Sequence, residues 1–217
     1  LILAVASGML FVLRHFAGPR APRLSPVGLL TGSAVLSAIG LYLLSFADNA
    51  ATAFGFATIF GLGIAYFWPT MLGVAAERFP KGGALVLSLM GTVGNAAIAF
   101  VLPVMGGIVD HYSVDYVERA VPSQAQDVLQ YGASGQAIAI DAQAVAALPP
   151  DSELAGVVNQ AQSEGFAMAF RWVSVLPTIL IVIFGAIAIF DRSQGGYKAE
   201  HLTAGDASSQ ALPEGAT

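Results

Sequence analysis

The chain has 217 residues, of which 56% are hydrophobic and only 11% are charged, and its formal net charge is −5. Soluble domains carry about 25% charged residues, so this composition excludes an ordinary soluble globular protein. The chain contains no cysteine, which excludes disulfides and Cys-based metal sites. It also lacks the basic face that nucleic-acid binding requires, and its residue pattern predicts no cofactor, no metal ion and no nucleic-acid partner.

Five apolar segments organise the chain. Four of them contain no Asp, Glu, Lys or Arg, and each is long enough to cross a bilayer, which takes about 20 apolar residues. These charge-free stretches are residues 24–47, 49–76, 82–109 and 172–190, and we place the last membrane helix at 168–190. The opening stretch, 1–13, is too short to cross alone. We interpret it as the cut end of a truncated helix, so that 1–109 holds four membrane helices. A signal peptide is the alternative, but no basic region precedes this stretch.

The basic residues alternate between the loops that join these segments. One set of loops holds Arg14, Arg20, Arg23, Arg78, Lys81, Arg192 and Lys198, whereas the other holds only Arg119 and Arg171. Cytoplasmic loops of membrane proteins carry an excess of Lys and Arg, so the first set is predicted to be cytoplasmic. The chain is therefore expected to cross a cell (inner) membrane five times and to end in the cytoplasm.

The segment 110–167 is predicted to be an extracytoplasmic loop with short helices. Its net charge is strongly negative, which is typical of a solvated cap, with a substrate-capturing lid as the sharper alternative. Capping residues and helix breakers predict three helices: one begins at Ser123 and ends at Gly132, one covers 141–148 before Pro149 and Pro150, and one begins at Asp151 or Ser152. The Gly-, Ala- and Ser-rich end, 191–217, is predicted to be a disordered cytoplasmic tail.

The spans differ in polarity around the helix. Spans 24–47 and 172–190 are apolar on all sides, as expected of helices that face lipid. Spans 49–76 and 82–109 carry small and polar residues at three- and four-residue intervals, which place them on one face. The predicted substrate-binding residues are Tyr66, Trp68, Thr70 and Asn95. The residues predicted to serve helix packing, kinking or gating are Gly63, Pro69, Gly91, Gly94 and Pro103.

Each of these residues also has a purely structural interpretation. Small residues let membrane helices pack closely, so the stripes are either packing seams or the lining of a pathway. An unsatisfied amide at mid-membrane depth costs several kcal/mol, so Asn95 is expected either to bond a neighbouring helix or to line an aqueous cavity. Pro69, beside Trp68, is the best candidate for a bend next to a binding site. No ionisable residue lies in the middle of a complete span, so any proton carrier is expected elsewhere in the protein.

Three features of the sequence resemble the C-terminal half of a major facilitator superfamily transporter, from its eighth to its twelfth helix. The basic turn 14–23 falls where that family has the second copy of a Gly/Arg-rich cytoplasmic loop. The motif Phe-Trp-Pro-Thr at 67–70, with 77–83 after it, is similar to the family's tenth helix and the following inner loop. Residues 91–110 are similar to its Gly-rich eleventh helix.

This resemblance implies an all-α, polytopic membrane helix bundle that is half of a twelve-helix major facilitator fold. Its cavity would be lined by the eighth, tenth and eleventh helices, and a missing N-terminal half of the same protein would complete it. Within the superfamily, the chain is most similar to sugar-porter and fucose-permease-like members. The turn 14–23 lacks the acidic residue of the family's loop motif, so a gating salt bridge on that side is not implied.

The sequence favours a secondary membrane transporter, not an enzyme, that moves a small polar, sugar-like solute across the lipid bilayer by alternating access. An integral membrane enzyme is one alternative, and the neighbouring pair Asp110 and His111 is its candidate site. A structural or signalling membrane subunit is the other alternative, although such a subunit would not need two polar-striped helices.

Overall fold

The computed structural model describes residues 25–197. Predictions that fall on 1–24 and 198–217, including the truncated span and Arg14, Arg20 and Arg23, lie outside the described residues. Four described stretches of helix are long and apolar enough to cross a membrane, and they are Pro26–Leu44, Ala50–Arg78, Pro80–Ala120 and Glu153–Ser193. These stretches agree with the predicted all-α membrane protein.

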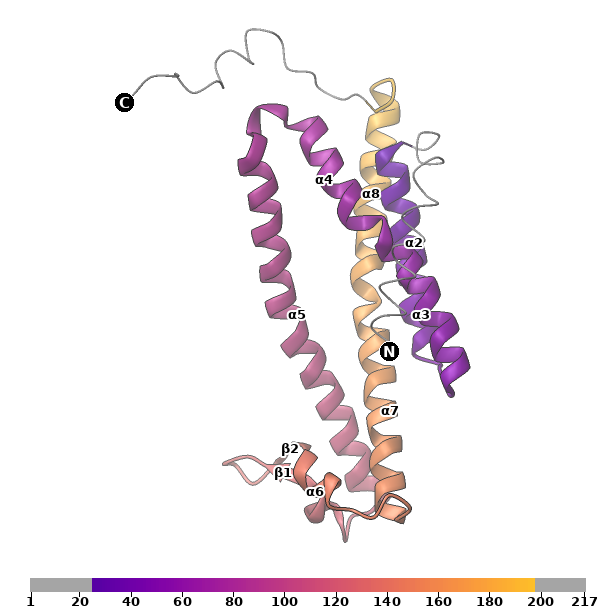
Figure 1. Cartoon of the computed structure of the whole chain (residues 1–217), viewed down its shortest axis with the longest axis vertical. Coiled ribbons are helices and arrows are strands. Elements are labelled where there is room, and N and C mark those ends of the chain that lie inside the picture. Colours follow the sequence, from indigo (N-terminus) through magenta and orange to yellow (C-terminus); the bar gives the residue numbers. More distant parts are fainter. Residues whose placement is uncertain (1–24, 198–217) are drawn as a thin grey trace, which may run out of the picture. The chain divides into compact units, whose positions relative to one another are not determined.

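The described chain is a succession of helices with one small sheet (Figure 1). The first helices are α2 (Pro26–Leu44), α3 (Ala50–Ala65), α4 (Phe67–Arg78) and α5 (Gly83–Ala120), with a 3₁₀ turn at Pro80–Gly82 before α5. Next come a 3₁₀ turn (Ala125–Asp127), β1 (Leu129–Tyr131), β2 (Ala137–Ile140) and the short helix α6 (Ala142–Ala146). The last helices are α7 (Glu153–Val173) and α8 (Val175–Ser193).

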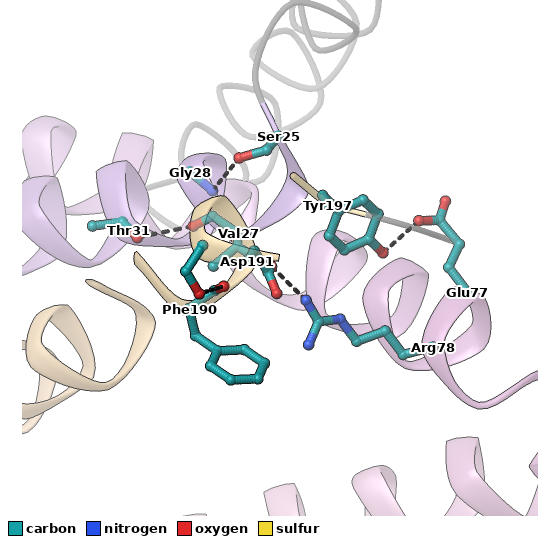
Figure 2. Close-up of polar contacts among 10 residues, drawn as sticks. Ser25, Val27, Gly28, Thr31, Glu77, Arg78, Phe190, Asp191 and Tyr197 are labelled. Atoms are coloured by element: carbon teal, nitrogen blue, oxygen red, sulfur yellow. Dashed lines mark hydrogen bonds and ion pairs between the residues drawn. The ribbon is translucent and has the colours of Figure 1, made fainter. Parts of the chain in front are cut away.

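Side-chain caps mark where the first two helices begin. The Oγ of Ser25 accepts a hydrogen bond from the backbone N–H of Gly28 at 3.1 Å, and Pro26 follows at the first helical position (Figure 2). Before α3, the Oδ1 of Asn49 accepts from the backbone N–H of Thr52 at 2.9 Å. Each cap satisfies a backbone N–H that has no partner inside its own helix.

Two of the long helical stretches are interrupted shortly before a proline. Helix α3 gives way to α4 at Tyr66, ahead of Pro69, and α7 gives way to α8 at Ser174, ahead of Pro177. Proline lacks an N–H and its ring clashes with the carbonyl four residues earlier, so regular hydrogen bonding fails at these points. Pro103 lies inside α5, which continues unbroken, and nothing in the structure explains this difference.

One predicted element of the segment between α5 and α7 is wrong. The helix expected from Ser123 to Gly132 is replaced by a 3₁₀ turn and by β1, which pairs antiparallel with β2. The backbone N–H of Gly132 donates to the carbonyl of Gln136 at 2.9 Å, and Gly135 has a φ of 76°. A positive φ favours glycine, so Gly135 turns a hairpin here, and Gly132 pairs across that hairpin instead of ending a helix.

The other two helices predicted in this segment are present with their caps. The Oδ1 of Asp141 accepts from the backbone N–H groups of Gln143 (2.8 Å) and Ala144 (3.1 Å) at the start of α6. The Oγ of Ser152 accepts from the N–H of Ala155 at 3.2 Å at the start of α7. Two helices run further than predicted. Helix α5 continues past residue 109 to Ala120, and α8 includes 191–193, which was assigned to the disordered tail.

The chain divides into two compact units. Within the described residues, the first contains 25–37, Ile59–Ala97 and 177–197, and the second contains Ala38–Thr58 and Ile98–Leu176. The second unit has an apolar core in which the ends of α5 and α7 pack on the hairpin segment. Its buried members are Val114, Val117, Ala125, Val128, Leu129, Leu154, Val158 and Ala161.

A glycine makes one close helix crossing possible in each unit. In the first unit, a Cβ on Gly63 of α3 would lie 2.6 Å from the backbone nitrogen of Ser37 and 2.9 Å from the carbonyl oxygen of Ser33, both on α2. In the second unit, a Cβ on Gly165 of α7 would lie 2.7 Å from the carbonyl oxygen of Val109 on α5. Only glycine permits these backbones to approach so closely.

Candidate functional site

Three of the predicted substrate-binding residues lie at the interruption between α3 and α4. Tyr66 is the residue between the two helices, and its carbonyl oxygen accepts a hydrogen bond from the N–H of Thr70 at 3.1 Å. Trp68 and Thr70 belong to the first turn of α4, on either side of Pro69. The proline therefore sets the local backbone that presents these side chains, within the charge-free stretch 49–76.

The side chain of Trp68 lies against Gly94 of the next long helix, α5. The indole carbons Cζ3 and Cη2 lie 3.2 Å and 3.3 Å from the position of a Cβ on Gly94 of α5. Any larger residue at 94 would push the indole away. The side chain of Trp68 remains 43% exposed. The contact places an aromatic surface directly beside the residue that precedes Asn95.

Asn95 is bound to its own helix. Its Nδ2 donates to the carbonyl oxygen of Gly91 at 2.9 Å, one turn earlier in α5. The hydroxyls of Thr92 and Ser88 bond back in the same way, to the carbonyls of Ser88 (3.0 Å) and Leu85 (2.9 Å). Sequence reasoning left a neighbouring helix or a cavity as the partner of Asn95. The structure shows a third arrangement, in which the amide hydrogens are partly satisfied locally and the side chain stays exposed.

The residues predicted to serve packing fall into two groups. Gly63 and Gly94 each have a neighbour so close that a Cβ would collide with it or press against it. A Cβ on Gly91 would meet nothing within 4 Å, and the carbonyl oxygen of Gly91 accepts the hydrogen bond from Asn95. Pro103 lies exposed within α5.

A polar cluster joins the end of α4 to the end of α8. The guanidinium of Arg78 forms an ion pair with the carboxylate of Asp191, and its Cζ lies 5.3 Å from the centre of the Tyr197 ring. The Tyr197 hydroxyl donates to the Oε2 of Glu77 at 2.6 Å (Figure 2). Burial and the neighbouring Glu77 carboxylate raise the pKa of Tyr197 from 10.0 to about 12. Arg78 is thus held between a carboxylate and an aromatic face.

Two glycines return the chain to this cluster after α8. Gly195 and Gly196 have φ values of 90° and 102°, and the N–H of Gly196 donates to the carbonyl of Asp191 at 2.8 Å. Such positive φ values after the last helical turn are typical of a glycine C-cap. Sequence reasoning identified Arg78 only as a loop charge, and it assigned Asp191 and Tyr197 to the disordered tail. The glycine pair directly after the last span was the signal that the chain turns there.

Sequence reasoning also missed the packing face of α7. Ala161, Gly165 and Ala169 are buried and recur every fourth residue, which is the small-residue spacing of a close helix crossing. The hydroxyl of Ser113 on α5 donates to the carbonyl of Ala161 across this crossing at 3.0 Å. The spacing was visible in the sequence, but it runs across the boundary drawn at residue 168 between the extracytoplasmic segment and the last membrane helix.

The pair considered for an enzyme belongs to a long helix. Asp110 and His111 lie within α5, and the His111 ring meets the Tyr112 ring edge to face at 5.2 Å. Among residues 25–197, no group of three or more His, Asp or Glu side chains could hold a metal ion. Searches of known protein families, of curated proteins and of solved structures found no match to the chain.

Proposed function

We propose that this protein is a secondary transporter of the major facilitator superfamily that moves a small polar solute by alternating access. The observation that carries the proposal is the interruption at Tyr66 within an otherwise charge-free helical stretch, with Trp68 docked on Gly94 beside it. Irregular backbone at membrane depth is tolerated where it is buried in protein or lines a water-filled cavity. Transporters use such broken helices to build substrate sites near the bilayer midplane.

The chemistry around this interruption suits an uncharged solute. Tyr66, Thr70 and Asn95 offer hydroxyl and amide groups, and Trp68 offers an aromatic face of the kind that packs on sugar rings. The stretches 49–76 and 82–109 contain no Asp, Glu, Lys or Arg that would select an ion. A sugar-like substrate fits this set, and any coupling group would come from the remainder of the protein.

Uptake into proteoliposomes tests the proposal. The complete protein would be reconstituted and supplied with a panel of radiolabelled monosaccharides. Trp68→Ala and Asn95→Ala are expected to reduce uptake at least about tenfold, because each removes a contact worth about 1.4 kcal/mol or more. Ile39→Ala, on an exposed apolar position of α2, is the matched control and should leave uptake unchanged. Unchanged transport by both site variants would remove these residues from the site.

Cysteine accessibility supplies a second test that does not require the substrate. The chain has no native cysteine, so single cysteines can be placed at Ser88, Gly91 and Asn95, with Ile39 as a lipid-facing control. A water-filled pathway predicts that a membrane-impermeant maleimide labels the three α5 positions and leaves position 39 unlabelled. No labelling at any of the three α5 positions would contradict a transport pathway along this helix.

A further inference from the structure

Arg171 stands at the polar end of the last charge-free stretch. The stretch 172–190 begins with the next residue, and α2 ends at Leu44, close to the end of the charge-free stretch 24–47. These two edges meet in space, because the Nε of Arg171 donates to the Oγ of Ser45 at 3.2 Å. Since both apolar stretches stop here, this is the level at which lipid headgroups replace hydrocarbon.

The Arg171 side chain is held in place from two sides. Ser45 is 5% exposed, and its hydroxyl donates to the carbonyl of Tyr42 at 2.7 Å, which leaves its oxygen lone pairs for the Nε–H of Arg171. The guanidinium carbon lies 4.8 Å from the centre of the Phe46 ring, so the cation rests on an aromatic face. The guanidinium is therefore oriented before any ligand arrives.

No carboxylate among residues 25–197 forms an ion pair with Arg171. Arg78 pairs with Asp191, and Arg119 pairs with Asp115. Asp48, the acid nearest to Ser45 in the chain, instead accepts hydrogen bonds from the Asn49 amide at 2.8 Å and the Thr52 hydroxyl at 3.2 Å. The two terminal nitrogens of Arg171 thus present a planar fork of donors that matches a phosphate group.

Large aromatic side chains lie near this position in the chain: Tyr42 meets the Phe46 ring edge to face, and Trp172 follows Arg171. Tyr42, Phe46 and Trp172 are 53%, 51% and 59% exposed. Exposed Tyr and Trp concentrate at the membrane interface, where headgroups lie. We propose that Arg171, seated on Ser45 and Phe46, binds the phosphate of a phospholipid headgroup. The proposal concerns this lipid contact and is independent of whether the protein transports a solute.

Native mass spectrometry of the complete purified protein tests the site. The protein would be titrated with phosphatidylglycerol, with a diglucosyl diacylglycerol that has no phosphate, and with inorganic phosphate. Arg171→Gln is expected to bind phosphatidylglycerol about tenfold more weakly than the wild type, because it loses charge-assisted hydrogen bonds. Arg119→Gln is the matched control, since Arg119 already has its own carboxylate, and it should bind like the wild type.

Three outcomes would overturn the proposal. Equal binding of phosphatidylglycerol by Arg171→Gln and the wild type would remove Arg171 from the site. Equal binding of the phosphate-free glycolipid would show that the headgroup phosphate is not recognised. Tight Arg171-dependent binding of inorganic phosphate without lipid binding would assign the site to a soluble anion.

Two milder variants keep the test decisive if Arg171→Gln does not fold. Arg171→Lys retains the positive charge but loses the two parallel N–H donors of the guanidinium, so it should bind the phospholipid more weakly than the wild type does. Phe46→Leu keeps an apolar side chain but removes the aromatic face, and about threefold weaker binding is expected. Wild-type affinity in both variants would overturn the proposal.

Discussion

At some positions of this protein, the lack of a Cβ on glycine lets two helices approach one another closely. Gly63 and Gly165 face backbone atoms of the neighbouring helix, whereas a Cβ on Gly61 or Gly55 would meet nothing within 4 Å. The same residue type therefore has opposite consequences at different positions of similar helices. Where backbone lies opposite, the neighbouring helix must move to admit a methyl group.

Replacing Gly63 by alanine is expected to destabilise the protein by about 1–3 kcal/mol, because the methyl group would overpack the crossing of α2 and α3. Gly165→Ala should have a similar effect on α5 and α7. The measurement is thermal unfolding in detergent, followed by the helical circular dichroism signal. Gly61→Ala is the control, and it should be neutral or slightly stabilising because alanine is the better helix former. Equal stability of the Gly61 and Gly63 variants would contradict a tight crossing.

The hydroxyl of Tyr197 is expected to lose its proton at a higher pH than an ordinary tyrosine does. Burial and the Glu77 carboxylate raise its pKa from 10.0 to about 12. Because the folded pKa lies above the unfolded one, the contact contributes stability below about pH 10 and loses it as the pH rises through about 12. Glu77→Gln should lower the pKa of Tyr197, though not to 10.0, because burial is the larger cause.

Tyrosinate absorbance measures this pKa directly. Subtracting the titration of Tyr197→Phe from that of the wild type isolates the single hydroxyl. Glu164→Gln is the matched control and should leave the curve in place, because the side chains that shift the pKa of Tyr197 are those of Glu77 and Arg78. A difference curve centred at the same pH in the wild type and in Glu77→Gln would show that Glu77 does not influence the hydroxyl.

At the scale of whole helices, a proline follows each of the two interruptions by three residues. Pro69→Ala restores an N–H that can donate to the carbonyl of Ala65 and should join α3 and α4 into one helix. Hydrogen exchange of a peptide spanning 64–71 is then expected to slow at least about tenfold, because one more hydrogen bond must open. If the interruption serves transport, uptake should fall in the same variant.

Pro103→Ala is the control for this change. It adds the same N–H to a helix that is already continuous, so exchange near residue 66 should not change. Unaltered exchange in Pro69→Ala would mean that the interruption at Tyr66 does not depend on the proline.

At the scale of the whole molecule, the distribution of Arg and Lys predicts which end of each helix is cytoplasmic. Ser134→Cys, in the turn between β1 and β2, is expected to react with an impermeant maleimide added to intact cells. Gln194→Cys, after α8, should react only after the membrane is permeabilised. The reversed pattern would invert the orientation, and labelling of both sites in intact cells would contradict an odd number of crossings between them.

Charge-free stretches predicted where the long apolar helices lie better than where these helices end. Asp110 closes the apolar stretch of α5, but the helix continues to Ala120 because Val114 and Val117 enter the core of the second unit. Hydropathy reports contact with lipid and does not detect a helix that leaves lipid for a protein core. Local capping at Asp141 and Ser152 was predictable, because a cap needs only its own neighbours.

The candidate site was only partly predictable for the same reason. Tyr66, Trp68 and Thr70 were identifiable because they are neighbours of Pro69 on one stretch of helix. The contact of Trp68 with Gly94 joins two helices, and the contact of Arg171 with Ser45 joins residues far apart in the sequence. Such pairings depend on how helices approach, which the periodicity of a single helix does not specify.

Because the indole of Trp68 lies against Gly94, its intrinsic fluorescence reports on the candidate site. The chain contains two tryptophans, Trp68 and Trp172, and each is partly exposed. Trp172→Phe would leave an emitter only at the helix interruption, so its fluorescence spectrum should shift when a solute displaces water there. Trp68→Phe would leave an emitter only beside Arg171, where brominated lipids should quench it. Two single substitutions thus allow solute binding near Trp68 and phospholipid binding at Arg171 to be tested separately by tryptophan fluorescence, without an attached dye.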